Sequence, residues 1–129
     1  MRRLLPTYAD AVDLHAAYAY PDRRPWVRAN MVSSADGAVT LEGRSGGLSG
    51  AADREIFALL RSLSDVILVG AGTVRAEHYG PAEPSSAHAE PSSEHAEERA
   101  GRGAPPAPVI AVVSQRLELD PAAPLFAKA

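Results

Sequence analysis

Two runs of aliphatic residues constrain the fold of this chain more than any other feature. Residues 65–69 read DVILV and residues 109–113 read VIAVV. An unbroken aliphatic run of this length predicts a strand buried on both faces, as in a parallel sheet covered by helices. We therefore predict an α/β protein with a predominantly parallel sheet flanked by helices.

An amphipathic helix is predicted directly before the first of these runs. Ser49 or Gly50 is expected to cap it, because both residue types are favoured at helix N-termini. Acidic side chains in its first turns complement the helix dipole. Its apolar side chains recur at helical spacing, which predicts one face packed on the sheet: Ile56, Leu59, Leu60 and Leu63.

Residues 26–32 read WVRANMV and are bounded by Pro25 and by a polar turn sequence, which predicts another buried strand. Asn30 lies in its middle, and an unpaired buried amide would cost roughly 1–3 kcal/mol. Two alternatives stay open for the hydrogen-bond partner of this amide: neighbouring backbone groups and a bound ligand. A shorter strand is predicted over residues 38–41, and residues 45–50 form a Gly/Ser-rich turn.

The N-terminal residues 1–24 are predicted to form a packing arm, separate from a domain at residues 25–129. Thr7 is expected to cap a short helix within residues 9–18. Proline and aspartate residues interrupt the N-terminus before any signal-peptide core develops, and no apolar stretch is long enough for a membrane span. A cytoplasmic location is therefore the default expectation.

The composition excludes several classes of function. Hydrophobic residues make up 46% and charged residues 22% of the 129, as in a globular protein. A net charge of −3 gives no electrostatic case for nucleic acid or an anionic membrane. The chain has no cysteine, which excludes a disulfide, a thiol nucleophile and a thiolate-bound zinc.

Residues 82–108 contain a seven-residue unit written twice, EPSSAHA and EPSSEHA, followed by a Gly/Pro/Ala-rich stretch. This composition cannot bury enough apolar surface to offset the entropy of ordering, so it predicts a disordered insert. His88 and His95 resemble a pair of metal ligands, but repetition of a low-complexity unit explains them better. No metal site is predicted.

Polar residues follow the predicted strands at their carboxyl ends, where ligands bind in open α/β sheets. Ser34 and Asp36 follow the first strand, although Ser, Asp and Gly also make ordinary turns, and the spacing alone favours that alternative. Gly70 and Gly72 end the strand at residues 65–69 and lead into a helical start after Thr73, an arrangement that can cradle a phosphate.

This glycine segment does not match the dinucleotide fingerprint, because Arg75 stands where a third glycine is needed. After the last strand, Ser114 and Arg116 offer a hydroxyl and a guanidinium that suit a phosphate such as the 2′-phosphate of a dinucleotide. The alternative is that Arg116 is exposed to solvent and binds no phosphate.

Taken together, these motifs resemble the reductase of riboflavin biosynthesis, the C-terminal half of the bifunctional deaminase–reductase, whose fold is dihydrofolate-reductase-like. The resemblance rests on Ser-Ala-Asp-Gly at residues 34–37, on the Gly/Ser-rich turn to Ser49, and on DVILVGAGTV at residues 65–74. It covers residues 25–119 apart from the insert. Family members continue through a Glu-Gly-Gly-Pro segment, so we expect an incomplete sheet here.

The resemblance implies a substrate-binding set and a cofactor-binding set. The substrate-binding set is Asn30, Ser34, Asp36, Ser49 and Glu77, with Asp36 as the catalytic residue beside the nicotinamide. Ser49 would contact the sugar phosphate, and Glu77 replaces the more common aspartate. The set implied to bind NADPH is Val69, Gly70, Gly72, Thr73, Ser114 and Arg116.

The implied reaction is NADPH-dependent reduction of 5-amino-6-(5-phosphoribosylamino)uracil, a small-molecule substrate, to its ribitylamino form. Where the full domain is present, the resemblance implies a homodimer. The zinc-ligand motifs of the deaminase half do not occur in this sequence. Two alternatives stay open: a pteridine reductase, and a truncated, inactive paralogue that serves as a binding or dimerisation module.

Overall fold

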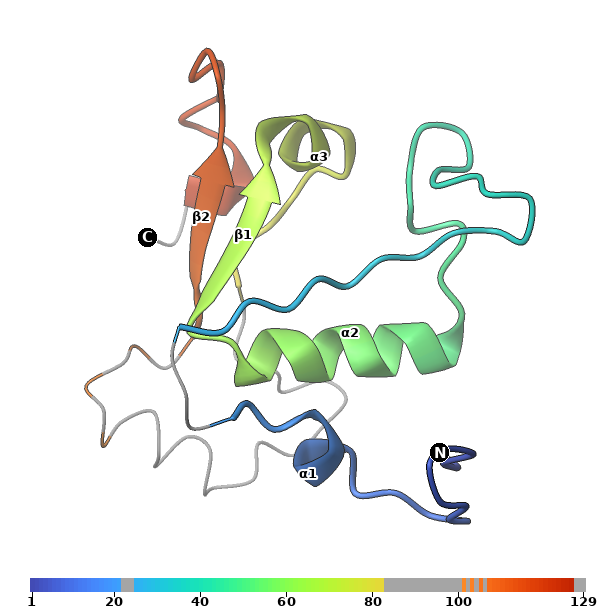
Figure 1. The fold of residues 1–129 in the computed structure, drawn as a ribbon. Helices are drawn as coiled ribbons and strands as arrows, with labels where there is room; N and C mark the ends of the chain where they lie inside the picture. The colour runs from blue at the N-terminus through green and yellow to red at the C-terminus, as the bar shows by residue number, and fades with distance from the viewer. Residues whose placement is uncertain (22–24, 83–100, 102, 104, 106, 127–129) are drawn as a thin grey trace.

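A computed structural model describes the chain except for residues 22–24, 83–100, 102, 104, 106 and 127–129. In Figure 1 the paired strands lie to one side of the molecule, with the longest helix below them. In chain order the elements are α1 (Leu14–Tyr18), α2 (Ala51–Leu63), β1 (Val66–Gly70), α3 (Ala71–Ala76), β2 (Val109–Val113) and the 3₁₀ helix η1 (Pro124–Phe126). Most of the insert predicted at residues 82–108 lies outside the described residues.

The two strands form a parallel sheet, which confirms the predicted α/β class. Val66 is paired with Val109, and the register continues to Gly70 and Val113. The first strand begins one residue later than predicted and includes Gly70. Because the strands are parallel and in register, both carboxyl ends lie at the same edge of the sheet.

Helix α2 matches its prediction closely. Gly50 is the N-cap and provides no side-chain bond, so the alternative in which Ser49 caps the helix is wrong. Asp53 in the first turn and Arg61 in the last turn both complement the helix dipole. Leu59 is only 4% exposed and anchors the apolar face of the helix.

The core of the described residues is small: Leu59, Ala71, Val74 and Leu125. Helix α3 packs against both strands. The prediction that both strands are buried on two faces is wrong, because one face of the sheet is exposed. Leu68 on that face is 71% exposed, since no described element covers it.

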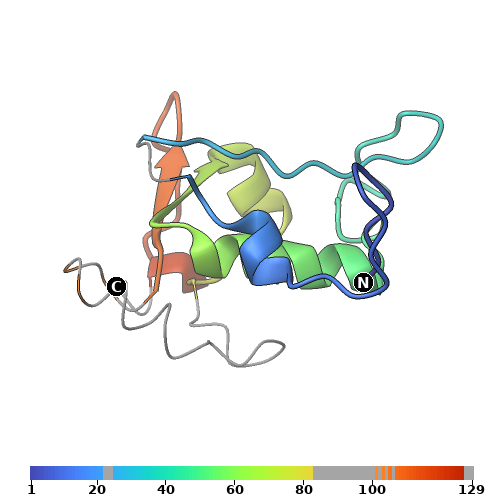
Figure 2. The same ribbon diagram turned by 60° about the horizontal axis from the view of Figure 1, so that its bottom comes forward.

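The predicted strand at residues 26–32 is also wrong. In both views of the molecule this segment is an extended coil that does not join the sheet (Figures 1 and 2). Val27 is 88% and Met31 is 82% exposed. A strand forms only when its backbone groups find a neighbour to pair with, and among the described residues this segment pairs with neither β1 nor β2.

The second predicted strand, at residues 38–41, is also wrong, because this segment lies unpaired between two turns and only Leu41 forms a bridge. Leu41 and Arg44 exchange backbone hydrogen bonds of 2.8 and 3.0 Å, which closes a tight two-residue loop. Glu42 and Gly43 between them both have positive φ, of 51° and 79°. This reversal makes residues 41–44 a hairpin turn and ends the extended run.

The N-terminal arm contains a shorter helix than predicted. Helix α1 begins at Leu14, and Asp13 is its N-cap through a 3.1 Å bond from the Ala16 N–H to Oδ1. Thr7 is therefore not the cap. The arm packs on α2 and is also tied to residues 26–32, because the Arg28 guanidinium donates to the Tyr18 carbonyl at 2.7 Å.

The Arg28 guanidinium also lies over aromatic rings of the arm. It is 4.5 Å from the centre of the Tyr20 ring and 5.7 Å from that of Tyr18. These distances allow cation–π attraction.

Within the described part of the chain, every helix is too short or too polar to cross a membrane.

Candidate functional site

The cofactor-binding residues predicted from the sequence meet at the carboxyl edge of the sheet. Gly70 is both the last residue of β1 and the N-cap of α3, so the chain passes from strand to helix without a loop. Helix α3 begins at Ala71 and includes Gly72 and Thr73, three residues earlier than the predicted helical start. Gly70 is paired with Val113, so Ser114 leaves the sheet beside it.

The Gly70–Thr73 turn, which comprises the end of β1 and the first turn of α3, is open around its two glycines. A Cβ atom added at Gly70 or Gly72 would meet no heavy atom within 4 Å. Both positions have ordinary backbone conformations, so the glycines are not required by a left-handed φ. The open space lets a ligand approach the backbone closely, which a side chain at these positions would hinder.

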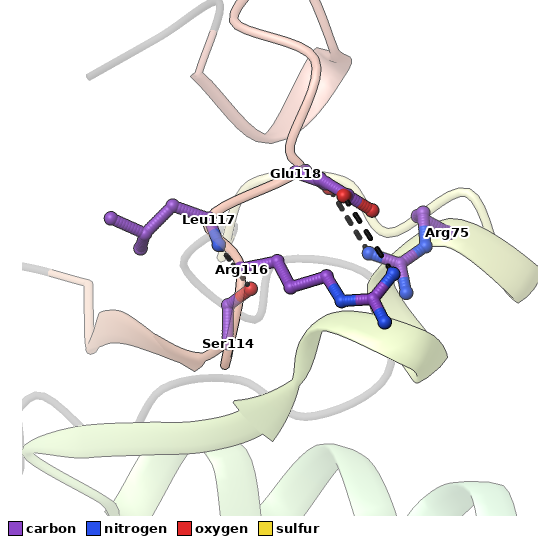
Figure 3. A network of polar contacts seen from close by, with 5 residues as sticks. All are labelled: Arg75, Ser114, Arg116, Leu117 and Glu118. Carbon is purple, nitrogen blue, oxygen red and sulfur yellow. Dashed lines mark hydrogen bonds and ion pairs between the residues drawn. The ribbon is translucent and has the colours of Figure 1, made fainter.

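Beyond β2, the chain folds back over α3 through a small polar network (Figure 3). The Ser114 hydroxyl accepts a 3.0 Å bond from the Leu117 N–H, which turns the chain at Leu117 with a φ of 55°. Arg75 of α3 donates to the Glu118 carbonyl at 3.0 Å. Arg116 lies 4.0 Å from the Glu118 carboxylate.

This network brings two guanidinium groups to one place on the surface. Arg75 and Arg116 both point toward Glu118 in Figure 3. The side chains of Arg116 and Glu118 are strongly exposed, so their ion pair contributes at most about 1 kcal/mol to stability. The sequence interpretation missed Arg75 and Glu118, because 43 residues separate them and only the pairing of the strands brings them together.

Asp36 lies in a closed turn that spans Ser34 to Ala38. The Ser34 hydroxyl donates to the Asp36 carboxylate, and the Ser34 and Ala38 backbones are joined by a 2.9 Å bond. Gly37 has a φ of 89°, which a residue with a side chain adopts only with strain. Residues 34–38 therefore form the turn that spacing alone favoured.

The hydrogen bond from the Ser34 hydroxyl, followed by the bond involving the Ala38 backbone, holds the pKa of Asp36 below its usual range. Asp36 is therefore ionised at neutral pH. An ionised carboxylate accepts hydrogen bonds and attracts positive charge, but it cannot donate a proton. The turn and a role in binding are compatible, because the carboxylate stays exposed at the turn's surface.

Ser49 lies just before α2, and Glu77 is the C-cap residue of α3. The Ser49 hydroxyl donates to the Asp53 carboxylate at 2.6 Å, beside the start of α2. The Glu77 Oε1 atom accepts bonds from the backbone N–H and the hydroxyl of Ser45, at 2.7 and 2.9 Å. These two bonds, the backbone one first, lower the pKa of Glu77. Ser45 was missed because nothing local in the sequence marks it.

The predicted substrate-binding residues are only partly brought together. Glu77 is bonded to the loop that carries Ser49. Asn30 is exposed in the unpaired coil, and within the described residues no hydrogen bond joins Asn30 or Asp36 to Ser49 or Glu77. In the same described residues, no group of three or more His, Asp or Glu side chains could hold a metal ion.

Comparison with known proteins identifies the family of the chain. A family model described as the RibD C-terminal domain matches residues 25–129. Among solved structures, the chain is similar to a pyrimidine reductase-like protein from Corynebacterium diphtheriae, with 30% sequence identity and a TM-score of 0.57. The similarity covers 72% of this chain and 35% of that one. A comparison with curated proteins gave no match.

This likeness confirms the expected dihydrofolate-reductase-like α/β fold, of which the chain contains a part. The chain spans about a third of the length of its solved relative. The family match nevertheless covers far more than half of the chain, including both strands and the predicted site. The chain therefore belongs to the RibD C-terminal domain family, the reductase family of riboflavin biosynthesis.

Proposed function

We propose that this chain contributes the cofactor edge and part of the substrate site of an NADPH-dependent pyrimidine reductase. The substrate is 5-amino-6-(5-phosphoribosylamino)uracil and the product is its ribitylamino form. When bound, NADPH would supply the hydride that adds to C1′ of the opened ribose. The protein residues bind and orient both molecules.

One observation carries the cofactor part of the proposal. The parallel register of β1 and β2 brings the Gly70–Thr73 turn and the Ser114–Arg116 segment to the same edge of the sheet. Ligands of open α/β sheets bind outside the carboxyl ends of the strands. The two segments that the family resemblance relates to NADPH are far apart in sequence, yet the fold makes them neighbours.

The chemistry of the individual residues supports this arrangement. The open glycine turn allows the cofactor to lie against the backbone, because no side chain projects there. Arg116 supplies positive charge for the 2′-phosphate, and guanidinium groups suit phosphate geometry. Asp36 provides an ionised carboxylate beside the substrate, where it would accept hydrogen bonds from the N–H or hydroxyl groups of the substrate.

The test measures binding and turnover separately with purified protein. NADPH and NADH are titrated against the chain by calorimetry, and turnover is followed by the loss of NADPH absorbance with the pyrimidine substrate or a pteridine. We expect preference for NADPH and reduction of the pyrimidine. Reduction of the pteridine alone would contradict the substrate assignment, and failure to bind either nucleotide would contradict the cofactor assignment.

A variant of Arg116, the residue proposed to bind the 2′-phosphate of NADPH, makes this test more specific. Arg116→Gln is expected to weaken NADPH binding about tenfold while leaving NADH binding unchanged, because only NADPH carries the 2′-phosphate. Arg2→Gln, in the exposed part of the N-terminal arm, is the matched control and should change neither affinity. Equal loss for both nucleotides would mean that Arg116 does not face the 2′-phosphate.

A binding or dimerisation module is the second candidate, and the exposed sheet face favours it. Four aliphatic side chains on that face are more than half exposed: Val66, Leu68, Val109 and Val113. Apolar faces of this kind mark interaction sites. Sedimentation of the chain and of Leu68→Lys tests for a homodimer. A dimer that binds no nucleotide would favour the module over the reductase.

A further inference from the structure

The contact between Glu77 and Ser45 joins two parts of the molecule that are 32 residues apart. Both donors of Ser45, its N–H and its hydroxyl, bond to the same carboxylate oxygen at 2.7 and 2.9 Å. Both residues are half-buried. Hydrogen bonds to an ionised carboxylate are among the stronger ones in proteins, so this pair is well suited to hold a loop in place.

On one side of the contact, Ser45 begins the loop that leads to α2. Its carbonyl accepts a 2.9 Å bond from the Leu48 N–H, and Ser49 follows at the next residue. The Ser49 hydroxyl in turn bonds to Asp53 in the first turn of α2. Fixing Ser45 therefore fixes the path of the chain to Ser49.

On the other side of the contact, Glu77 ends α3. It is the C-cap residue, and its N–H bonds to the Thr73 carbonyl at 2.9 Å. The next bond, from the Tyr79 N–H to the Val74 carbonyl at 3.0 Å, holds the chain beyond Glu77 on the helix. Val74 is buried, so the base of Glu77 is fixed to the packed part of the molecule.

We propose that Glu77 is a positioning residue whose carboxylate clamps Ser45 and so sets the place of the 45–50 loop relative to the Gly70–Thr73 turn. This inference rests on the proposed function and on the family resemblance, which relates Ser49 of the loop to the substrate phosphate and the turn to NADPH. Glu77 then acts on substrate binding through Ser45 rather than by direct contact. The clamp would keep the 45–50 loop and the Gly70–Thr73 turn at a fixed distance before either ligand binds.

Amide hydrogen exchange of the 129-residue chain without ligand tests the clamp itself. Glu77→Ala removes the acceptor of the Ser45 N–H, so exchange at Ser45 and Leu48 should become about threefold to tenfold faster, with β2 exchange unchanged. Glu55→Ala, an exposed glutamate on α2, is the matched control. Unchanged exchange in the loop, or an equal rise in β2, would overturn the proposal.

Kinetics of variants at Ser45 and Glu77 separate positioning from direct contact. Ser45→Ala should raise the KM for the pyrimidine substrate about threefold to tenfold with kcat within about twofold, because it weakens the clamp and touches no ligand. Ser45→Thr, which keeps both donors, should restore the KM. A normal KM in Ser45→Ala together with a raised KM in Glu77→Gln would show that Glu77 contacts the substrate directly.

The two readouts distinguish failure of this inference from failure of the proposed function. Faster loop exchange in Glu77→Ala with no turnover by any variant would support the clamp and contradict the reductase. Turnover with unchanged loop exchange would support the reductase and contradict the clamp.

Discussion

Two regions with similar apolar content behave differently in this molecule. The unit formed by α2, β1, α3 and β2 buries its key side chains, with Leu59 only 4% and Val74 only 5% exposed. The segment at residues 26–32 leaves Val27 and Met31 more than 80% exposed. Both regions contain the residue types of buried strands, yet only the first contains paired strands.

The difference shows what an apolar run requires to become a strand. Residues 66–70 and 109–113 pair with each other, and one face of the pair packs on α3. The coil at residues 26–32 has favourable composition, but within the described residues it pairs with no strand. Strand formation therefore depends on a neighbour as much as on the segment's own sequence.

The largest expected effect comes from the packed unit. Leu59→Ala removes most of a buried side chain and should lower the free energy of unfolding by about 2–4 kcal/mol. The matched change in the exposed coil, Val27→Ala, should lower it by less than about 0.5 kcal/mol. Urea unfolding followed by circular dichroism measures both. Similar losses for the two variants would mean that the coil is packed in solution.

A smaller effect is expected where the coil meets the N-terminal arm. Arg28→Ala removes the bond to the Tyr18 carbonyl and the contacts with two tyrosine rings, so it should release the arm at a loss of about 1 kcal/mol. Limited proteolysis within residues 1–20 should become faster. Arg28→Lys should only partly restore protection, because lysine lacks the planar guanidinium. Full protection in Arg28→Ala would show that other contacts hold the arm.

The smallest effect on stability is expected at the Ser34–Ala38 turn. The pKa of Asp36 is lowered in the folded chain, so its contribution to stability is present at neutral pH and is lost as the pH falls through the folded-state pKa. Asp36→Asn should change the unfolding midpoint little and remove this acid dependence. NMR titration of the Ser34 and Ala38 signals measures it.

Turnover of the Asp36→Asn variant shows whether Asp36 only forms the turn or also orients the substrate. If Asp36 orients the substrate, Asp36→Asn should lower turnover at least tenfold, by more than about 1.4 kcal/mol of transition-state stabilisation. Asp120→Asn, in an exposed turn near the C-terminus, is the matched control and should keep full turnover. Equal turnover in Asp36→Asn and the unmodified chain would leave Asp36 as a turn former only.

The sequence predicted the elements whose causes are local. Helical spacing of the apolar residues around Leu59 was sufficient to predict α2, and two aliphatic runs were sufficient to predict β1 and β2. Their carboxyl ends carried the candidate cofactor residues, and the parallel register brought those residues together. These features follow from periodicity and from the geometry of parallel sheets.

The features that failed or were missed depend on distant residues. The prediction of a strand at residues 26–32 was wrong, because the sequence of this segment does not show whether another strand pairs with it. The Glu77–Ser45 and Arg75–Glu118 contacts join residues 32 and 43 positions apart, and each partner by itself is an ordinary polar residue. Only the three-dimensional arrangement shows that these side chains act as pairs.

The central claim is that the carboxyl edge of the β1–β2 sheet binds NADPH. Titration of NADPH into isotope-labelled chain, followed by backbone amide NMR, tests it most directly. We predict saturable shifts concentrated at residues 70–73 and 114–116, with residues 1–20 unaffected. Shifts confined to the N-terminal arm, or no saturable shift at the sheet edge, would contradict the account.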